Sequence, residues 1–281
     1  MRKSRFGPGH PGVLLFWACL VFFAGCVSHL EEAKSHFASG EEYYRAYQTE
    51  KAVASFKRAL SEAELETRKR PSAQAYMLKG LAELNLQKWE TAKESFLKAH
   101  SFGFEKGEEW AAQLTLFGLA STLHEMGLRK NAAGVYKSIL DKSKFDPVTR
   151  LAAEKYVELT LEKVLTSAGA GRKKMLQNLL KTMEKLIAKN YGCGFYHYLK
   201  SQVLAHLLQY RESFEAAVIA RELGLPSRQI SRDNDNQVVF CYRKLGETLS
   251  SREWQDFESL YRAWLKRWGW TDPGSPAWKK R

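Results

Sequence analysis

Two glycine-rich segments have spacings that could hold a phosphate. Gly7–Gly12 reads G-x-G-x-x-G, the dinucleotide fingerprint, but it contains two prolines and follows no strand pattern. Gly169–Lys174 resembles a phosphate loop, yet it lacks the leading glycine and the Lys-Ser/Thr ending. We interpret the first as a chance match and the second as a linker between helices, so neither predicts a nucleotide site.

Other chemistry-bearing patterns are absent from the sequence. It contains no H-E-x-x-H, G-x-S-x-G or C-x-x-C motif. The close histidine pairs are His29 with His36 and His197 with His206, and neither spacing places both rings on one helical turn. We therefore predict no catalytic residue, no metal ligand, no cofactor and no enzymatic activity.

The first 26 residues have the pattern of an export signal. Basic residues at positions 2, 3 and 5 precede the apolar run Val13–Phe23, and small residues follow it. The run is shorter than the ~20 residues that span a bilayer. Ala24-Gly25-Cys26 resembles the lipobox of bacterial lipoproteins, although Phe23 replaces the usual leucine. The resemblance implies a signal peptide at 1–25 and acylation of Cys26, for example with palmitate; an ordinary secreted protein is the alternative.

A lipidated Cys26 would determine where the protein resides. Acyl chains give stable membrane anchoring, and residues 26–30 would form a short tether. Val27 in place of aspartate favours, by analogy with enteric sorting, the outer membrane facing the periplasm over the inner membrane. Loss of residues 1–25 removes three basic and no acidic residues, which leaves a net charge of +10. Such a domain would be attracted to anionic head groups or an acidic partner, unless its cations only solvate helix faces. We predict no nucleic-acid partner.

Two cysteines, Cys193 and Cys241, remain in the folded part after such processing. Cys193 lies between glycines, in a loop pattern, whereas Cys241 lies on an apolar helix face. An exported compartment permits a disulfide between them, and two free structural thiols are the alternative.

The body of the chain repeats with an offset of 40 residues. Apolar residues recur at spacings of three and four, which is typical of helices. Small or aromatic character is kept at four positions: Gly40, Gly80 and Ala120; Ala52, Ala92 and Ala132; Phe56, Phe96 and Tyr136; and Ala59, Ala99 and Ile139. The pattern predicts stacked helical hairpins in which small residues permit close approach and an aromatic ring fills the adjoining space.

These residues resemble the tetratricopeptide repeat (TPR) family, clearly over about residues 30–145 and more weakly over 195–270. The resemblance implies an all-α solenoid of about six antiparallel hairpins. We expect repeats 1–3 within 31–145, divergent hairpins and a closing repeat within 147–270, and a basic, flexible tail at 271–281. The 40-residue unit exceeds the family's usual 34.

The resemblance also implies a binding groove along the first helices of the hairpins. The family's groove positions lie three residues before, and one and four residues after, the small residue of each first helix. Here they are Phe37, Glu41, Tyr44, Met77, Leu81, Leu84, Phe117, Ser121 and His124. The alternative for several of them is packing between helices. The family's basic clamp for a terminal carboxylate is missing.

We therefore expect a lipid-anchored adaptor or scaffold that binds a protein or peptide partner at the bacterial cell envelope, in a role of the envelope or outer-membrane assembly type. The alternative is a basic lipoprotein that binds an anionic ligand such as a glycan or a lipid head group. The residues that favour this alternative are Arg68, Lys69, Arg70, Arg172, Lys173 and Lys174.

Overall fold

The computed structural model describes residues 28–142 and 146–268, and every regular element in these ranges is an α-helix. The chain divides into two compact units at Lys106 and Gly107, which are described separately. The predicted signal peptide, Cys26 and the tail at 271–281 lie outside the described residues. None of the described helices has both the length and the apolar character that a membrane crossing requires.

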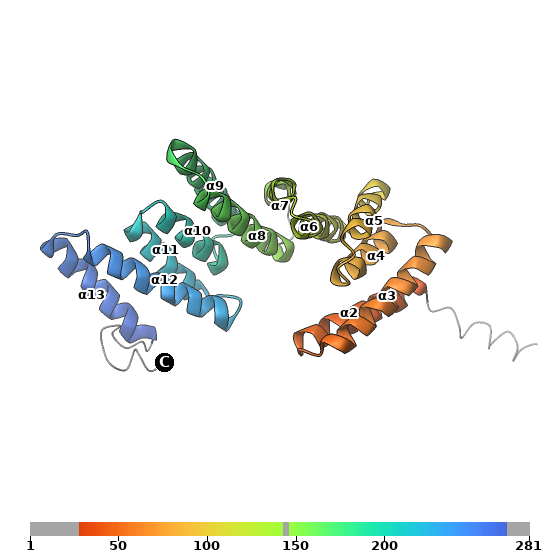
Figure 1. Cartoon of the computed structure of the whole chain (residues 1–281). Coiled ribbons are helices and arrows are strands. Elements are labelled where there is room, and N and C mark those ends of the chain that lie inside the picture. The colour runs from red at the N-terminus through yellow and green to blue at the C-terminus, as the bar shows by residue number, and fades with distance from the viewer. Residues whose placement is uncertain (1–27, 143–145, 269–281) are drawn as a thin grey trace, which may run out of the picture. The chain divides into compact units, whose positions relative to one another are not determined.

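The first unit consists of two helical hairpins (Figure 1). Its helices are α2 (His29–Arg45), α3 (Thr49–Lys69), α4 (Ala73–Asn85) and α5 (Trp89–Phe102). Helix α4 starts after Pro71, where the Ser72 side chain accepts a hydrogen bond from the backbone N–H of Ala75. Helix α5 ends at Gly103, whose φ of 74° suits a residue without a side chain.

The predicted small-to-aromatic contact holds each of these hairpins together. A Cβ atom at Gly40 would lie 2.5 Å from the Phe56 ring, and one at Gly80 would lie 2.9 Å from the Phe96 ring. Phe56 and Phe96 are 2% and 0% exposed. Because the rings occupy the space of the missing side chains, the two helices of a hairpin approach closely. The sequence interpretation of the repeat is confirmed here.

The second unit contains the third repeat and the three hairpins that follow it. Its helices are α6 (Glu109–Glu125), α7 (Arg129–Lys142), α8 (Asp146–Leu165), α9 (Gly169–Lys189), α10 (Gly194–His206), α11 (Tyr210–Leu223), α12 (Arg228–Gly246) and α13 (Ser251–Trp268). In the third repeat, buried Ala120 and Tyr136 occupy the small and aromatic positions. The described helices thus form six successive pairs, as expected for an all-α solenoid.

The last hairpin buries the aromatic face predicted for the C-terminal helix. Phe257, Tyr261 and Trp264 are buried against α11 and α12, and Phe214 meets Phe257 edge-on with ring centroids 4.7 Å apart. Free, buried Cys193 and Cys241 show that the alternative of two unpaired thiols holds in this structure. The Cys241 thiol donates to Ser213 Oγ at 3.2 Å.

The turns inside several hairpins share a left-handed residue. Tyr47, Gln87 and Gly127 have φ values of 58°, 59° and 76° and are spaced by the 40-residue repeat; Leu208 has 63° in a later turn. Only Gly127 adopts this conformation without steric cost, because other L-residues crowd the following carbonyl. Three turns therefore carry local strain that the packed hairpins hold in place.

Candidate functional site

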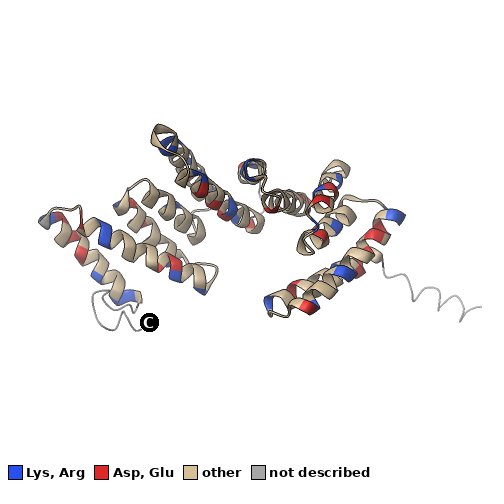
Figure 2. Cartoon of the chain, in the orientation of Figure 1, with Lys and Arg blue, Asp and Glu red and all other residues tan. Residues whose placement is uncertain are grey.

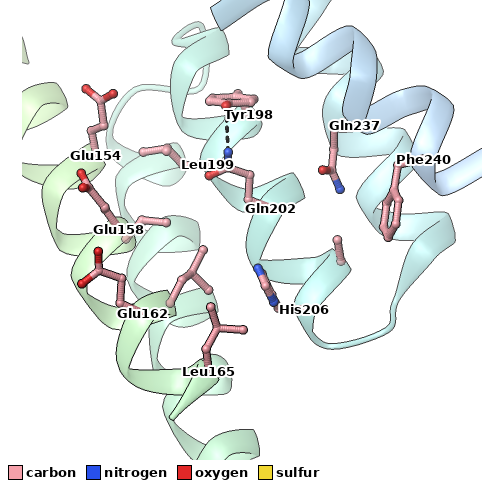
Figure 3. Close-up of a pocket in the computed structure, with 13 residues that line it drawn as sticks. Glu154, Glu158, Glu162, Leu165, Tyr198, Leu199, Gln202, His206, Gln237 and Phe240 are labelled. Atoms are coloured by element: carbon pink, nitrogen blue, oxygen red, sulfur yellow. Dashed lines mark hydrogen bonds between the residues drawn. The ribbon is translucent and has the colours of Figure 1, made fainter. Parts of the chain in front are cut away.

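The first helices of the last three hairpins, α8, α10 and α12, line a groove of about 590 Å³ (Figure 3). The polar and aromatic residues that line it form one row on each helix, and we call each row a column. The columns are Glu154, Glu158 and Glu162 on α8; Tyr198, Gln202 and His206 on α10; and Gln237 and Phe240 on α12. Spacings of four residues place the members of the first two columns one above another.

Hydrogen bonds at the start of α8 fix the two main walls of this groove. Asp146 accepts a hydrogen bond from Tyr196 Oη at 2.9 Å and one from Asn190 Nδ2 at 3.3 Å, and it pairs with Arg150. Burial alone would raise the pKa of Asp146, but the hydrogen bonds from Arg150 and Tyr196 outweigh it and lower this pKa. The contact joins α8 to the end of α9 and to α10, so the facing columns keep a fixed register.

The floor of the groove is apolar and closely packed. Val157 on α8 is 1% exposed and Leu199 on α10 is 2% exposed. Gly194 permits this packing, because a Cβ there would lie 2.3 Å from the carbonyl oxygen of Gly224. The backbone of α10 therefore lies directly against the end of α11.

Tyr198 is the polar side chain of the groove with the least solvent contact, at 8% exposure. Its hydroxyl oxygen accepts a hydrogen bond from Gln202 Nε2 at 2.7 Å. Burial, aided by the negative charges of Asp233 and Glu154, raises the pKa of Tyr198 to about 12. The phenol is therefore protonated at neutral pH, and its proton meets no acceptor among the described residues.

His206 closes the same column near the end of α10. Burial lowers its pKa, and the positive charge of Arg172 on α9 lowers it further. The imidazole is thus neutral at pH 7, where it can both donate and accept a hydrogen bond.

Several groove residues predicted from the sequence contribute to packing. Met77 and Leu81 are 3% and 9% exposed in the core of the first unit. Phe37 and Phe117 are half-buried beside the repeat aromatics Phe56 and Tyr136. Packing between helices was the alternative stated for such positions, and these four residues contribute to it; their role in binding a partner stays a prediction.

The other predicted groove residues are more open. Leu84, Glu41 and His124 are half-buried, and Tyr44 is 63% exposed. Ser121 Oγ is hydrogen-bonded to Tyr136 Oη at 3.0 Å. Their role as a partner-binding surface stays a prediction.

The same positional rule finds residues of the observed groove when it is applied to α8 and α10, the first helices of the fourth and fifth hairpins. Around the buried Val157, the positions three before, one after and four after are Glu154, Glu158 and Leu161. Around the buried Ser201 they are Tyr198, Gln202 and Ala205, and all six residues line the groove. Sequence reasoning missed them because valine and serine, at Val157 and Ser201, stand where the first three repeats have glycine or alanine.

The residues proposed for anion binding lie in different units. Arg68, Lys69 and Arg70 are exposed at the end of α3, and Lys69 Nζ is 2.8 Å from His29 Nε2. Arg172 lies at the end of the first turn of α9, and Lys173 and Lys174 lie in its second turn. Cations are favoured by the dipole at a helix C-terminus and disfavoured at an N-terminus. Arg68 and Lys69 are therefore favourably placed in the last turn of α3, whereas the first turn of α9 has no acidic residue beside the second cluster.

A second groove, of about 660 Å³, lies between α7, α8 and α9. Its lining includes the acidic residue Glu162, which also lines the first groove, and four cations: Arg129, Lys130, Lys137 and Lys163. Arg129 and Lys137 are paired with Glu162 and Asp141 at 3.3 and 3.2 Å, whereas Lys130 and Lys163 have no acidic partner within ion-pair distance in the described part of the chain. Across both units, acidic and basic residues are otherwise interspersed (Figure 2).

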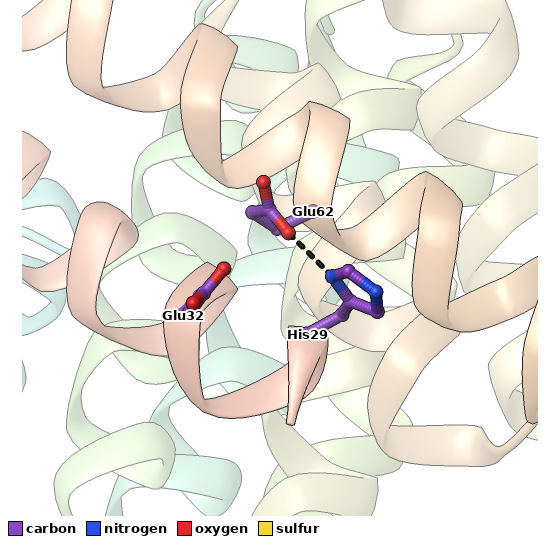
Figure 4. A group of neighbouring side chains, drawn as sticks. All are labelled: His29, Glu32 and Glu62. Atoms are coloured by element: carbon purple, nitrogen blue, oxygen red, sulfur yellow. Dashed lines mark hydrogen bonds and ion pairs between the residues drawn. The ribbon is translucent and has the colours of Figure 1, made fainter. Parts of the chain in front are cut away.

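His29, Glu32 and Glu62 form a small cluster whose ligand-type atoms lie within 4.8 Å of one another (Figure 4). His29 Nδ1 is 2.7 Å from Glu62 Oε2, and the other ring nitrogen is contacted by Lys69. With both ring nitrogens of His29 engaged, the hydrogen bonds to Glu62 and from Lys69 join the start of α2 to α3.

The hairpin packing and the groove along first helices define a TPR-like helical-repeat protein. No protein-family model matches the sequence, and no curated protein matches it. Among solved structures, YrrB, described as a TPR protein with an unusual peptide-binding site, aligns at 16% identity and a TM-score of 0.41, covering 73% of this chain and 93% of YrrB. PilF of Pseudomonas aeruginosa aligns at 14% identity and a TM-score of 0.47, covering 82% of this chain and 98% of PilF.

Proposed function

We propose that this protein is a non-enzymatic adaptor that binds a segment of a partner protein in the groove of α8, α10 and α12, while acyl chains on Cys26 anchor it at the bacterial envelope. The observation that carries the binding role is the groove itself. Three first helices supply its walls, its floor is apolar, and hydrogen-bonding groups converge on it. Its volume of about 590 Å³ lies within the ~300–1,000 Å³ range of ligand sites.

A photo-crosslinking amino acid in place of Gln202 tests the binding role in cells. Gln202 lines the groove, whereas Glu212 lies exposed on α11 outside it and serves as the matched control position. We expect a discrete crosslinked protein from position 202 that is absent from position 212. Identical products from both positions, or none from 202, would contradict a partner in the groove.

The anchor rests on the sequence Ala24-Gly25-Cys26 and is tested separately. Metabolic labelling with a palmitate analogue should mark the wild-type protein and leave Cys26→Ser unlabelled. The wild-type protein should sediment with membranes and, by the Val27 argument, with the outer-membrane fraction, whereas Cys26→Ser should be released in soluble form. Labelling that persists in Cys26→Ser would refute lipidation at this residue.

The second candidate function is anion binding, and the basic groove of α7, α8 and α9 favours it. Lys130 and Lys163 line this groove without an ion-pair partner among the described residues. A glycan sulfate or a lipid head group would supply the missing charge. Binding to heparin or to anionic vesicles should weaken steeply with salt and should fall in a Lys130→Gln/Lys163→Gln variant. Unchanged binding in that variant would place any anion site elsewhere.

A further inference from the structure

The walls of the α8–α10–α12 groove carry charge of one sign. Glu154, Glu158 and Glu162 line it on α8, and no lysine or arginine is among the described residues that line it. Figure 3 shows the three carboxylates in a row along this wall. The chain as a whole has a formal net charge of +13, so the charge of this lining is opposite in sign to that of the protein. The groove is therefore attractive to a cation and repels an anion.

The protein itself neutralises this row only in part. Glu158 pairs with Lys155 on its own helix at 2.8 Å, and Glu162 pairs with Arg129 of α7 at 3.3 Å. Both are pairs of partly exposed groups, which contribute little on their own. Glu154 has no cation within ion-pair distance among the described residues. At the end of the opposite wall His206 is neutral at pH 7, because burial and Arg172 lower its pKa, so it adds no opposing charge.

The opposite wall presents backbone-type hydrogen-bonding groups. Among the described residues, the proton of the buried Tyr198 hydroxyl meets no acceptor, and the carbonyl oxygen of the Gln202 amide that donates to this hydroxyl meets no donor. The Gln237 amide donates to Ser213 Oγ at 3.1 Å and to Cys241 Sγ at 3.6 Å, and its carbonyl oxygen meets no donor in the same described ranges. These are a donor and two acceptors of the kind that pair with peptide C=O and N–H groups. A helical ligand would have satisfied those groups internally, whereas an extended one offers them.

The spacing of the glutamates on α8 matches the spacing of alternate side chains in an extended peptide. Residues four apart on α8 are separated by about 6 Å along the helix axis, from a rise of 1.5 Å per residue. Alternate side chains of an extended peptide are about 6.6 Å apart and point to the same side. A lysine or arginine at every second position would therefore meet successive carboxylates. Phe240, 42% exposed at the far edge, adds an aromatic face that also favours cations.

We propose that this groove binds an extended, cationic peptide segment with lysine or arginine at alternate positions, held by Glu154 and Glu158 on one side and by Tyr198, Gln202 and Gln237 on the other. The proposal rests on the proposed function, because it names the chemistry of the segment that occupies the same groove. It assigns a specificity opposite to that of a clamp for acidic groups.

The test uses the full-length protein in detergent and fluorescein-labelled, end-blocked peptides of nine residues. The probe has lysine at alternate positions with serine between them. One control peptide has glutamate in place of lysine, and a second has the same lysines in one contiguous block. We expect saturable binding of the alternating-lysine probe, weaker binding of the block peptide and none of the glutamate peptide. Equal binding of the alternating and glutamate peptides would overturn the proposal.

Variants of the α8 glutamates test whether these carboxylates bind the lysine probe. Glu154→Gln/Glu158→Gln should weaken binding of the probe about tenfold, because it removes two partly exposed charge pairs with the peptide, and should flatten the salt dependence of binding. Glu212→Gln, on the exposed side of α11, should bind like wild type. Far-UV circular dichroism of each variant checks that the helices are intact. An unchanged affinity in the double variant would refute the assignment to these carboxylates.

The failure of this proposal and the failure of the proposed function give different results. If crosslinks from position 202 persist in cells while the lysine probe does not bind, the groove takes a partner of other chemistry and the cationic assignment is wrong. If position 202 captures nothing and no peptide binds, the groove is not a binding site and both proposals fall.

Discussion

Replacement of Gly194 by alanine should destabilise the second unit through a clash that no side chain can relieve. A Cβ at this position would lie 2.3 Å from the carbonyl oxygen of Gly224 and 2.6 Å from that of Ala220. Real Cβ contacts essentially never fall below 3.0 Å, so the start of α10 must move from the end of α11 by about 0.7 Å. Both neighbouring atoms belong to the backbone, which cannot rotate away.

The magnitude follows from two opposing effects. Overpacking in a close-packed region costs about 1–3 kcal/mol, and two backbone contacts place this site at the upper end. Alanine in a helix recovers about 0.5–1 kcal/mol relative to glycine. We therefore expect Gly194→Ala to lower the free energy of unfolding by about 2 kcal/mol. Since Tyr198 lies one turn along the displaced helix, affinity for the lysine probe should fall as well.

Gly134→Ala is the matched control, because it places the same methyl group on helix α7 with nothing within 4 Å. We expect it to raise the free energy of unfolding by about 0.5–1 kcal/mol. Urea unfolding followed by circular dichroism at 222 nm measures both variants. If Gly194→Ala unfolds at the same urea concentration as wild type while Gly134→Ala is stabilised, the close approach of α10 and α11 is wrong.

Four further variants test stability. Leu208→Gly should raise the free energy of unfolding by about 0.5–1 kcal/mol, because it relieves a left-handed residue, and a higher melting temperature would confirm it. Burial raises the pKa of Glu83, which accepts a 2.6 Å hydrogen bond from Ser95; the contribution of Glu83 to stability is therefore present below pH 4.5 and lost as pH rises through the raised pKa, so over this range of a pH series the urea midpoint of wild type should fall relative to that of Glu83→Gln. Ser95→Ala should cost about 1–3 kcal/mol in the same urea assay at pH 7. The lowered pKa of Asp146 means that its contribution is present above pH 3.8 and is lost in acid, so Asp146→Asn should be less stable than wild type at pH 7 and approach it at low pH.

The part of the fold that could be predicted from sequence is the part fixed by steric exclusion. Gly40 and Gly80 admit Phe56 and Phe96 because any larger residue would collide with those rings, so the pattern repeats visibly every 40 residues. The left-handed turns illustrate the opposite case. Gly127 signals its conformation, whereas Tyr47 and Gln87 adopt it without any sequence signal because the hairpin geometry imposes it.

The observed groove could have been located in part from the sequence. Its columns are visible as Glu154, Glu158 and Glu162, and as Tyr198, Gln202 and His206, at helical spacing. What the sequence could not supply is the pairing of these columns. That depends on hydrogen bonds from Tyr196 and Asn190 to Asp146, which link residues 44 and 50 positions apart. Polar residues at such separations leave no periodic trace.

Neighbouring positions on α8 have separate roles: one packs the core and the next lines the groove. Val157 is 1% exposed and packs the floor, so its truncation to alanine should cost stability through an unfilled cavity. Glu158, one residue later, is exposed on the groove wall, and a change to glutamine there should leave the fold almost unaffected. The wall can therefore vary its charge while the floor keeps its shape. Because a buried position and an exposed wall position are adjacent on one helix, the charge of the groove can change while the hairpin packing stays the same.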